Sequence, residues 1–185
     1  MTGEEFWKII EISRVEFDPQ LRDGNQARQV ELLEVALRAL RPQELVDYER
    51  FFTESFFMLY TWQHWAAVYL IEGGCSDDGF DYFSAWMISM GEQAFSAVVA
   101  SPDNLADYAY LPGVEVIAFP DIMGSGSKIY EEMTGLEIPD SCYQPGRPDE
   151  PLGTRWDETD LSQFELALPK VWRACCDSWP TDQLT

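Results

Sequence analysis

The sequence predicts an all-α fold, a single bundle-like domain of about seven helices with an irregular segment near residues 108–155. From residue 4 to residue 100, apolar side chains recur at the three- and four-residue spacing of amphipathic helices. Gly, Pro, Ser and Asp residues interrupt this pattern at short intervals, as in short helix–helix connections. The 185 residues are 46% hydrophobic and include seven Trp, eight Tyr and eleven Phe, which is enough for one sizeable core. We therefore expect one domain over residues 1–185.

The first three helices are predicted before residue 60. Residues 4–15 place Phe6, Ile9 and Ile10 on one face. A second helix follows the turn at residues 23–25 and has its own apolar stripe: Val30, Leu33, Leu37 and Leu40. Pro42 suits the first position of a third helix, because its missing N–H would have no partner there. Short connections between these helices predict the start of a bundle.

The fourth and fifth helices form the most aromatic part of the chain, residues 61–91. Thr61 is the predicted N-cap of residues 62–71, and Gly73-Gly74 ends that helix because glycine takes positive φ without steric cost. Ser76 is the predicted N-cap of the fifth helix. Asp77 and Asp78 fall in its first turn, where the helix dipole favours negative charge.

The remaining chain is less regular. A sixth helix is expected over residues 92–100, and residues 108–120 are predicted to be extended or irregular. The glycines at 124 and 126 weaken any helix before Ile129–Thr134. Residues 139–154 contain four of the eleven prolines and predict a mobile loop. Pro169 is expected to separate two short helices near the C-terminus.

The net charge of −21 comes from 33 acidic and 12 basic residues, and no Lys or Arg lies between Phe51 and Ser127. This charge disfavours direct binding to nucleic acid, which needs cationic contacts to phosphate. It is compatible with a basic protein or peptide partner, with metal cations, and with mimicry of nucleic-acid charge. Solubility alone also accounts for an acidic surface.

The predicted location is the cytoplasm. No apolar run approaches the ~18–20 residues that cross a bilayer, so no membrane association is expected. The N-terminal residues are acidic where a signal peptide would be basic. The four cysteines, at positions 75, 142, 175 and 176, include no C-x-x-C pair and are expected to be mostly buried free thiols. We predict neither a metal site nor a cofactor.

The candidate functional site is the turn at residues 73–79. Gly73, Gly74, Cys75, Ser76, Asp77 and Asp78 offer exposed amides, a thiol near a helix N-terminus and two carboxylates. With Trp62, Tyr69 and Trp86 as walls, they predict a small-ligand or cation site in which the aspartates act as ligands or acid–base groups and the thiol as a nucleophile. The structural alternative is favoured slightly, because the same residues also serve to reverse the chain and cap its helices.

His64 is the only histidine, and a Cys–His pair with Cys75 is disfavoured. Eleven residues at ~1.5 Å each separate them by ~16 Å along a helix axis. Contact of His64 with Cys142 or Cys176 stays open. The sequence around His64 is not H-E-x-x-H, which excludes the zinc-peptidase motif.

Gly-Ser-Gly-Ser-Lys at residues 124–128 superficially suggests a phosphate-binding loop. A P-loop needs four residues between its glycines and then Gly-Lys-Ser/Thr, neither of which is present. Nucleotide binding is therefore not expected here.

Several short motifs stand out along the chain. The longest is Y-L-I-E-G-G-C-S-D-D-G-F-D-Y-F at residues 69–83, and the others are Phe6-Trp7, Y-T-W at 60–62, W-M-I-S-M-G at 86–91, Y-E-E-M-T-G at 130–135 and Trp156-Asp157. Together these motifs resemble an uncharacterised bacterial family, domain-of-unknown-function family 4240. The resemblance implies a mostly helical domain with no established activity and no assigned catalytic residue. Glu72 departs from the family pattern, in which a neutral polar residue is more usual, as does the break at residues 124–127.

Two functions from different classes follow. The leading hypothesis is a non-enzymatic interaction or regulatory module whose acidic face meets a basic protein or peptide. The alternative is an enzyme or small-ligand binder with its site at the Gly73–Asp78 turn. A mimic of nucleic-acid charge is a third, less favoured possibility, because it requires carboxylates spaced along one face like phosphates.

Overall fold

A computed structural model describes residues 1–21, 25–144, 146–157, 160 and 162–176. Every regular element within these ranges is a helix, which confirms the all-α class. The described residues form ten α-helices and three short 3₁₀ turns. The number of α-helices exceeds the expected seven because the chain forms several short helices after residue 100. Among the described residues, no helix combines the length and apolarity needed to cross a membrane.

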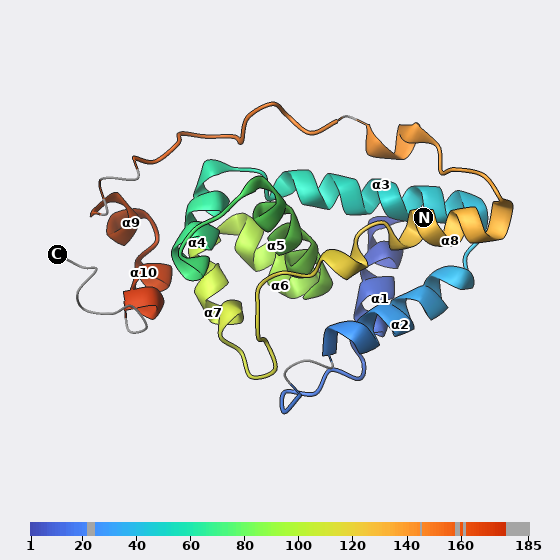
Figure 1. Cartoon of the computed structure of the whole chain (residues 1–185), viewed down its shortest axis with the longest axis horizontal. Coiled ribbons are helices and arrows are strands. Elements are labelled where there is room, and N and C mark those ends of the chain that lie inside the picture. The colour runs from blue at the N-terminus through green and yellow to red at the C-terminus, as the bar shows by residue number, and fades with distance from the viewer. Residues whose placement is uncertain (22–24, 145, 158–159, 161, 177–185) are drawn as a thin grey trace.

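The N-terminal helices lie at one end of an elongated molecule (Figure 1). Their bounds are α1 Gly3–Ser13, α2 Asn25–Arg38 and α3 Pro42–Met58. Thr2 and Glu5 form a capping box at the start of α1, in which each side chain accepts a hydrogen bond from the other residue's backbone N–H. α3 runs along one long side of the molecule with α8 (Ser125–Thr134) beside it (Figure 1).

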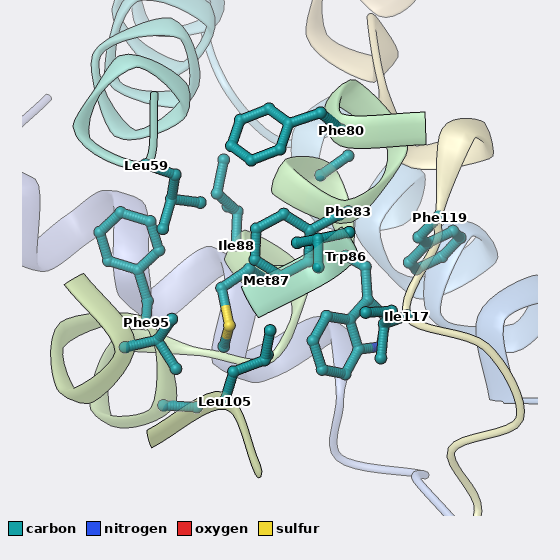
Figure 2. Close-up of a cluster of buried hydrophobic side chains, with 14 of the residues drawn as sticks. Leu59, Phe80, Phe83, Trp86, Met87, Ile88, Phe95, Leu105, Ile117 and Phe119 are labelled. Atoms are coloured by element: carbon teal, nitrogen blue, oxygen red, sulfur yellow. The ribbon is translucent and has the colours of Figure 1, made fainter. Parts of the chain in front are cut away.

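Three helices form the centre of the molecule: α4 Trp62–Glu72, α5 Asp77–Ser89 and α6 Glu92–Ala100. Almost the whole second half of α5 is buried, including Trp86, Met87 and Ile88. Figure 2 shows these side chains packed with Leu59, Phe95 and Leu105 from neighbouring elements. They belong to a hydrophobic cluster that extends from α1 to α10, as expected for one domain.

The connection between α6 and α8 is mostly irregular. It contains η1 (Pro102–Leu105), the single turn α7 (Ala106–Ala109) and η2 (Pro120–Ile122). Residues 111–119 form no strand. They pack on α5 through buried Ile117 and Phe119, and the Phe119 N–H donates to the Tyr82 carbonyl at 3.0 Å. Of the two conformations that the sequence allowed, the irregular one is observed.

The prediction that glycine weakens the helix before Ile129 was wrong. α8 begins at Ser125, after Gly124 in the left-handed conformation (φ 68°). The carboxylate of Glu49 on α3 accepts the Ser127 N–H at 2.8 Å and so caps the helix from outside. Gly126 lies so close to α3 that a Cβ would stand 2.7 Å from Glu49 Oε1 and 2.8 Å from Tyr48 Cδ1. Glycine here permits the two helices to approach.

After α8 and η3 (Asp140–Tyr143), the chain returns along the length of α3 towards α4 (Figure 1). We call residues 146–157 the strap. Leu152 in the strap forms an isolated parallel bridge with Thr61. The chain ends its described part in α9 (Ser162–Ala167) and α10 (Pro169–Cys176), separated near Pro169 as predicted. The mobility expected for residues 139–154 stays a prediction.

Candidate functional site

The turn between α4 and α5 is built as its residue types predict. Gly73 ends α4 in the left-handed conformation (φ 68°, ψ 23°), and Gly74 also has positive φ (153°). The Ser76 hydroxyl accepts the Gly79 N–H at 3.1 Å and caps α5. Reversal of the chain and helix capping thus explain these three residues.

Asp77 and Asp78 differ in position although they are adjacent. Both are exposed, and neither carboxylate accepts a hydrogen bond from a described residue. Asp77 lines a cavity of about 560 Å³, whereas Asp78 lies outside its lining. The α5 dipole favours both charges. Only Asp77 is also placed to meet a ligand.

The cavity lies between the α4–α5 region and the strap. The α4–α5 side is mainly aromatic: Tyr60, Trp62, Trp65, Tyr69, Cys75 and Asp77. The strap side is mainly polar and proline-rich: Arg147, Pro148, Asp149, Glu150, Pro151, Arg155 and Trp156. Cavities of ~300–1,000 Å³ are typical of small-molecule sites. Of the three expected walls, Trp62 and Tyr69 are therefore at the site.

The aromatic side chains hold one another in fixed orientations. Trp65 stacks on Phe80 with ring centroids 4.6 Å apart and planes 4° apart. Trp156 of the strap meets Trp62 edge-on at 5.5 Å and Tyr69 at 5.8 Å. Such pairs contribute ~0.5–1.5 kcal/mol beyond burial of area. The cavity wall is thus largely preformed.

The strap is attached to α4 through the backbone. The Leu152 N–H donates to the Tyr60 carbonyl at 3.0 Å, and the Trp62 N–H donates to the Leu152 carbonyl at 2.9 Å. Trp62 is the first residue of α4, so its N–H has no partner within the helix. The strap therefore supplies part of the N-terminal cap of α4.

Two strap arginines lie over aromatic rings. The Arg147 guanidinium is 4.1 Å from the Tyr60 ring centroid, and its Nη1 is 2.8 Å from Asp81 Oδ1. The Arg155 guanidinium is 5.1 Å from the Trp62 ring centroid. Both distances are within the ~6 Å range of cation–π attraction. Burial raises the pKa of Asp81, and the charge of Arg147 acts against that shift.

Cys75 is not an activated thiol. Burial raises its pKa to about 12, and the negative charges of Glu72, Asp77 and Asp81 add to the effect. The sulfur stays protonated at neutral pH, so it is a poor nucleophile there. Burial, with the carboxylates adding to it, thus opposes the thiolate that the α5 dipole alone would favour.

His64 has a structural position. It is 3% exposed, its Nε2 lies 3.0 Å from the Val98 carbonyl, and its Nδ1 lies 2.8 Å from Thr61 Oγ1. A carbonyl only accepts, so Nε2 carries the proton and Nδ1 accepts from the Thr61 hydroxyl. Both ring nitrogens are therefore engaged without a cysteine. The side chain of Cys176 lies outside the described residues.

Trp86 is not part of this cavity. It is 3% exposed on the buried face of α5 and lines a different cavity, with Arg14 directly after α1. Trp86 lies three residues after the buried Phe83 and so shares the core face of its helix. The sequence prediction also missed Tyr60, Asp81 and the strap arginines. No local pattern links Arg147 to Asp81, because 66 positions separate them.

No three His, Cys, Asp or Glu side chains gather in a way that would hold a metal ion within the described ranges. The glycine-rich stretch at residues 124–128, which suggested a phosphate-binding loop, is capped by a side chain of the protein itself. Its helix N-terminus is filled by the protein's own Glu49 carboxylate, which takes the position an anionic ligand would need.

Together, the fold and the cavity define an all-α protein with an aromatic-walled pocket bordered by a C-terminal strap. The profile of one family, described as "Protein of unknown function (DUF4240)", matches residues 1–132. The chain belongs to this family. No curated protein and no solved structure matches it. The matched region includes the α4–α5 side of the cavity and ends before the strap, so the motif at Trp156-Asp157 lies outside it.

Proposed function

We propose that this protein is a binding module that takes an arginine-bearing segment of a partner protein at the cavity beside the α4–α5 turn. One observation carries the proposal. Arg147 of the strap lies 4.1 Å from the Tyr60 ring centroid and 2.8 Å from Asp81 Oδ1. The chain's own arginine thereby uses an aromatic face and a carboxylate together, which is how a guanidinium is recognised in other proteins.

The charge around the cavity favours the same partner. Three carboxylates, those of Asp77, Asp149 and Glu150, line it against the two strap arginines, next to the aromatic faces of Trp65 and Tyr69. Residues 51–127, which supply the α4–α5 side, contain no Lys or Arg. Complementary charge accelerates association and selects basic partners over acidic ones. These features support the acidic interaction module that the composition predicts.

The chemistry of the turn favours binding over covalent catalysis. The Cys75 thiol, with a pKa of about 12, is not a thiolate at neutral pH. The ring nitrogens of His64 are engaged by Thr61 and Val98, away from the cavity lining. Neither residue is arranged as an activated nucleophile and base.

The proposal is tested by calorimetric titration of the full chain with a peptide of alternating arginine and glycine. The control peptide replaces each arginine with citrulline, which keeps the shape and removes the charge. We expect saturable binding of the arginine peptide that weakens as salt increases, because screened charges attract less. Equal binding of the citrulline peptide would contradict the proposal.

The adjacent aspartates provide a matched pair of variants. Asp77→Asn removes a cavity carboxylate, whereas Asp78→Asn removes a similarly exposed charge outside the lining. We expect Asp77→Asn to weaken arginine-peptide binding by about two- to fivefold, corresponding to ~0.4–1 kcal/mol for one exposed charge pair. Asp78→Asn should leave binding nearly unchanged. The opposite order would place the binding surface elsewhere.

A small cationic molecule is a second candidate ligand. The observation that favours it is the concave cavity of about 560 Å³ with aromatic walls, a shape suited to a compact ligand. Titration with tetramethylammonium distinguishes the two candidates, since it is an organic cation without a peptide backbone. Binding of tetramethylammonium without binding of the arginine peptide would favour the small molecule.

A further inference from the structure

A second cavity, of about 240 Å³, lies between the segment that follows α1, the start of α2, the end of α5 and residues 113–116. Since each water occupies ~30 Å³ in the liquid, the cavity has room for a molecule about eight waters in size. Trp86 and Met90 provide apolar lining, and Arg14 provides a charge. In Figure 2, Trp86 lies at the margin of the buried cluster beside Ile117.

Arg14 is half-buried and is held in a fixed position. Its guanidinium lies 5.2 Å from the Phe17 ring centroid, and Nη1 donates to the Ser89 carbonyl at 2.7 Å. Burial lowers the pKa of Arg14, while the charge of Glu11 opposes that shift. An arginine nevertheless stays charged at neutral pH. The cavity lining therefore contains one fixed positive charge, on Arg14, and one carboxyl group, on Glu115.

No carboxylate in the described ranges forms an ion pair with Arg14. This is unusual in a chain of net charge −21, in which Arg28, Arg38 and Arg41 each pair with a glutamate. Capping of the α5 C-terminus explains the bond from Nη1 to Ser89. It does not explain the position of the other two guanidinium nitrogens, Nε and Nη2.

The Nε–Nη2 edge of Arg14 has no hydrogen-bond partner among the described residues, and neither nitrogen is sealed from solvent. This edge presents two parallel N–H groups, the geometry that binds both oxygens of a carboxylate. Arg28 shows the arrangement in the same protein. Its Nε and Nη2 lie 2.7 and 3.0 Å from the two carboxylate oxygens of Glu16.

We propose that this cavity binds a small monocarboxylate, with its two oxygens on the Nε–Nη2 edge of Arg14 and its apolar part against Trp86. A single guanidinium matches one negative charge. A phosphate dianion would need further cations, and the nearby charged groups, Glu11 and Glu115, are acidic. The site is separate from the cavity proposed for arginine segments.

Gln29 adds a polar group to the same site. Its side chain is 6% exposed, and Nε2 donates to the Ser89 carbonyl at 2.9 Å. The amide oxygen, Oε1, therefore points away from this carbonyl. Gln29 lines the cavity, and no described residue donates to its Oε1. A hydroxyl or ammonium group on the ligand would complete its hydrogen bonding.

The experiment compares two matched pairs of probes, acetate with acetamide and benzoate with benzamide, in ¹⁵N–¹H spectra of the full chain. Each amide keeps the shape of the acid and lacks its charge. We expect the acids, up to ~10 mM, to give saturable shifts in the backbone amides of Ser89, Met90 and Gly113, with benzoate binding more tightly than acetate. Equal shifts with the amides, or none with the acids, would overturn the proposal.

Arg14→Lys keeps the charge but loses the two-pronged edge, and Arg28→Lys makes the same change on the exposed surface. We expect Arg14→Lys to weaken benzoate binding about tenfold or more and Arg28→Lys to leave it unchanged. Equal benzoate affinity in Arg14→Lys and the unsubstituted chain would overturn the assignment. If Arg14→Lys does not fold, the comparison of acids with amides still decides the question.

Discussion

At the scale of single residues, His64 makes stability depend on pH. Burial lowers the pKa of its imidazole from 6.5 to about 4, although the Val98 carbonyl acts in the opposite direction. Above pH 6.5 the ring is neutral in both the folded and unfolded chains. Below it, the unfolded chain gains a proton that the folded chain resists, so stability is lost as the pH falls towards 4.

We expect this loss to reach about 3 kcal/mol between pH 6.5 and pH 4, measured by urea unfolding. His64→Gln should cost ~1–3 kcal/mol at pH 7, because hydrogen bonds to Thr61 and Val98 are changed. The variant should then lose less stability than the unsubstituted chain as the pH falls. If the free energy of unfolding fell equally with pH in the two proteins, the effect could not be assigned to His64.

Glu49 should change the pH dependence of stability in the direction opposite to that of His64. It is 3% exposed, and burial raises the pKa of its carboxyl despite the backbone N–H groups of Ser127 and Gly126. A raised folded pKa gives stability that is present below the ordinary value and is lost as the pH rises through the raised value. Glu49 therefore penalises the folded state at neutral pH.

Two substitutions separate the charge of Glu49 from its hydrogen bond. Glu49→Gln keeps an acceptor for the Ser127 N–H, so its stability relative to the unsubstituted chain should improve from pH 4.5 to pH 7. Glu49→Ala leaves the α8 N-terminus without this acceptor and should cost ~1–3 kcal/mol. Denaturant unfolding at both pH values measures each effect. Greater destabilisation by Gln than by Ala would contradict the capping role.

At the scale of secondary-structure elements, the contact between α3 and α8 depends on Gly126. Alanine is the better helix former by ~1 kcal/mol, yet its Cβ would stand 2.7 Å from Glu49 Oε1 and 2.8 Å from Tyr48 Cδ1. We expect Gly126→Ala to destabilise the protein by ~1–3 kcal/mol in thermal or urea unfolding.

Gly3→Ala is the matched control for this prediction. Gly3 is also helical, and a Cβ there would have its nearest neighbour, Phe51 Cε1, at an ordinary 3.8 Å. This variant should stay within ~0.5 kcal/mol of the unsubstituted chain. Similar losses in both variants would mean that close approach to α3 is not the cause.

Local sequence predicted the helices whose caps are local. Thr61, Gly73 and Ser76 cap or end α4 and α5 through neighbours in the chain, and their residue types alone indicate this. The start of α8 is capped by Glu49 and that of α10 by Asp103, which accepts the Lys170 N–H at 2.8 Å. Caps from distant residues leave no periodic signal, so the start of α8 was misplaced.

The same reason explains what was missed at the candidate site. The sequence indicated the turn, Asp77 and two aromatic walls, because these lie within one stretch of chain. It did not indicate Asp81 with Arg147, since only the return of the strap along α3 brings them together. Trp86 belongs to the same stretch, but it lies on the core face of α5 and lines the other cavity.

At the scale of the whole molecule, net charge opposes compactness. The exposed ion pairs, such as Arg28–Glu16 and Arg41–Glu44, contribute little and are screened by salt. Self-repulsion from a net charge of −21 is screened too, and it involves many more charges.

We therefore expect salt to stabilise the protein. Raising NaCl from about 0.01 M to about 0.15 M shortens the Debye length from ~30 Å to ~8 Å, and the urea midpoint at pH 7 should increase. Equimolar sucrose, which carries no charge, serves as the control and should have a smaller effect at these concentrations. A midpoint that falls with NaCl would mean that the ion pairs outweigh the repulsion.

The backbone bridge between Thr61 and Leu152 also has a consequence for folding kinetics. It closes a loop of about 90 residues, and its two hydrogen bonds, like the Arg147–Asp81 ion pair, form only after residues far apart in the sequence have met, so the entropy of closure is lost first. We expect this closure to form after the α4–α5–α6 centre and to open before it. In native-state hydrogen exchange, the Leu152 amide should therefore exchange faster than the amides of Met87 and Ile88, and refolding should end with the joining of the strap to α4.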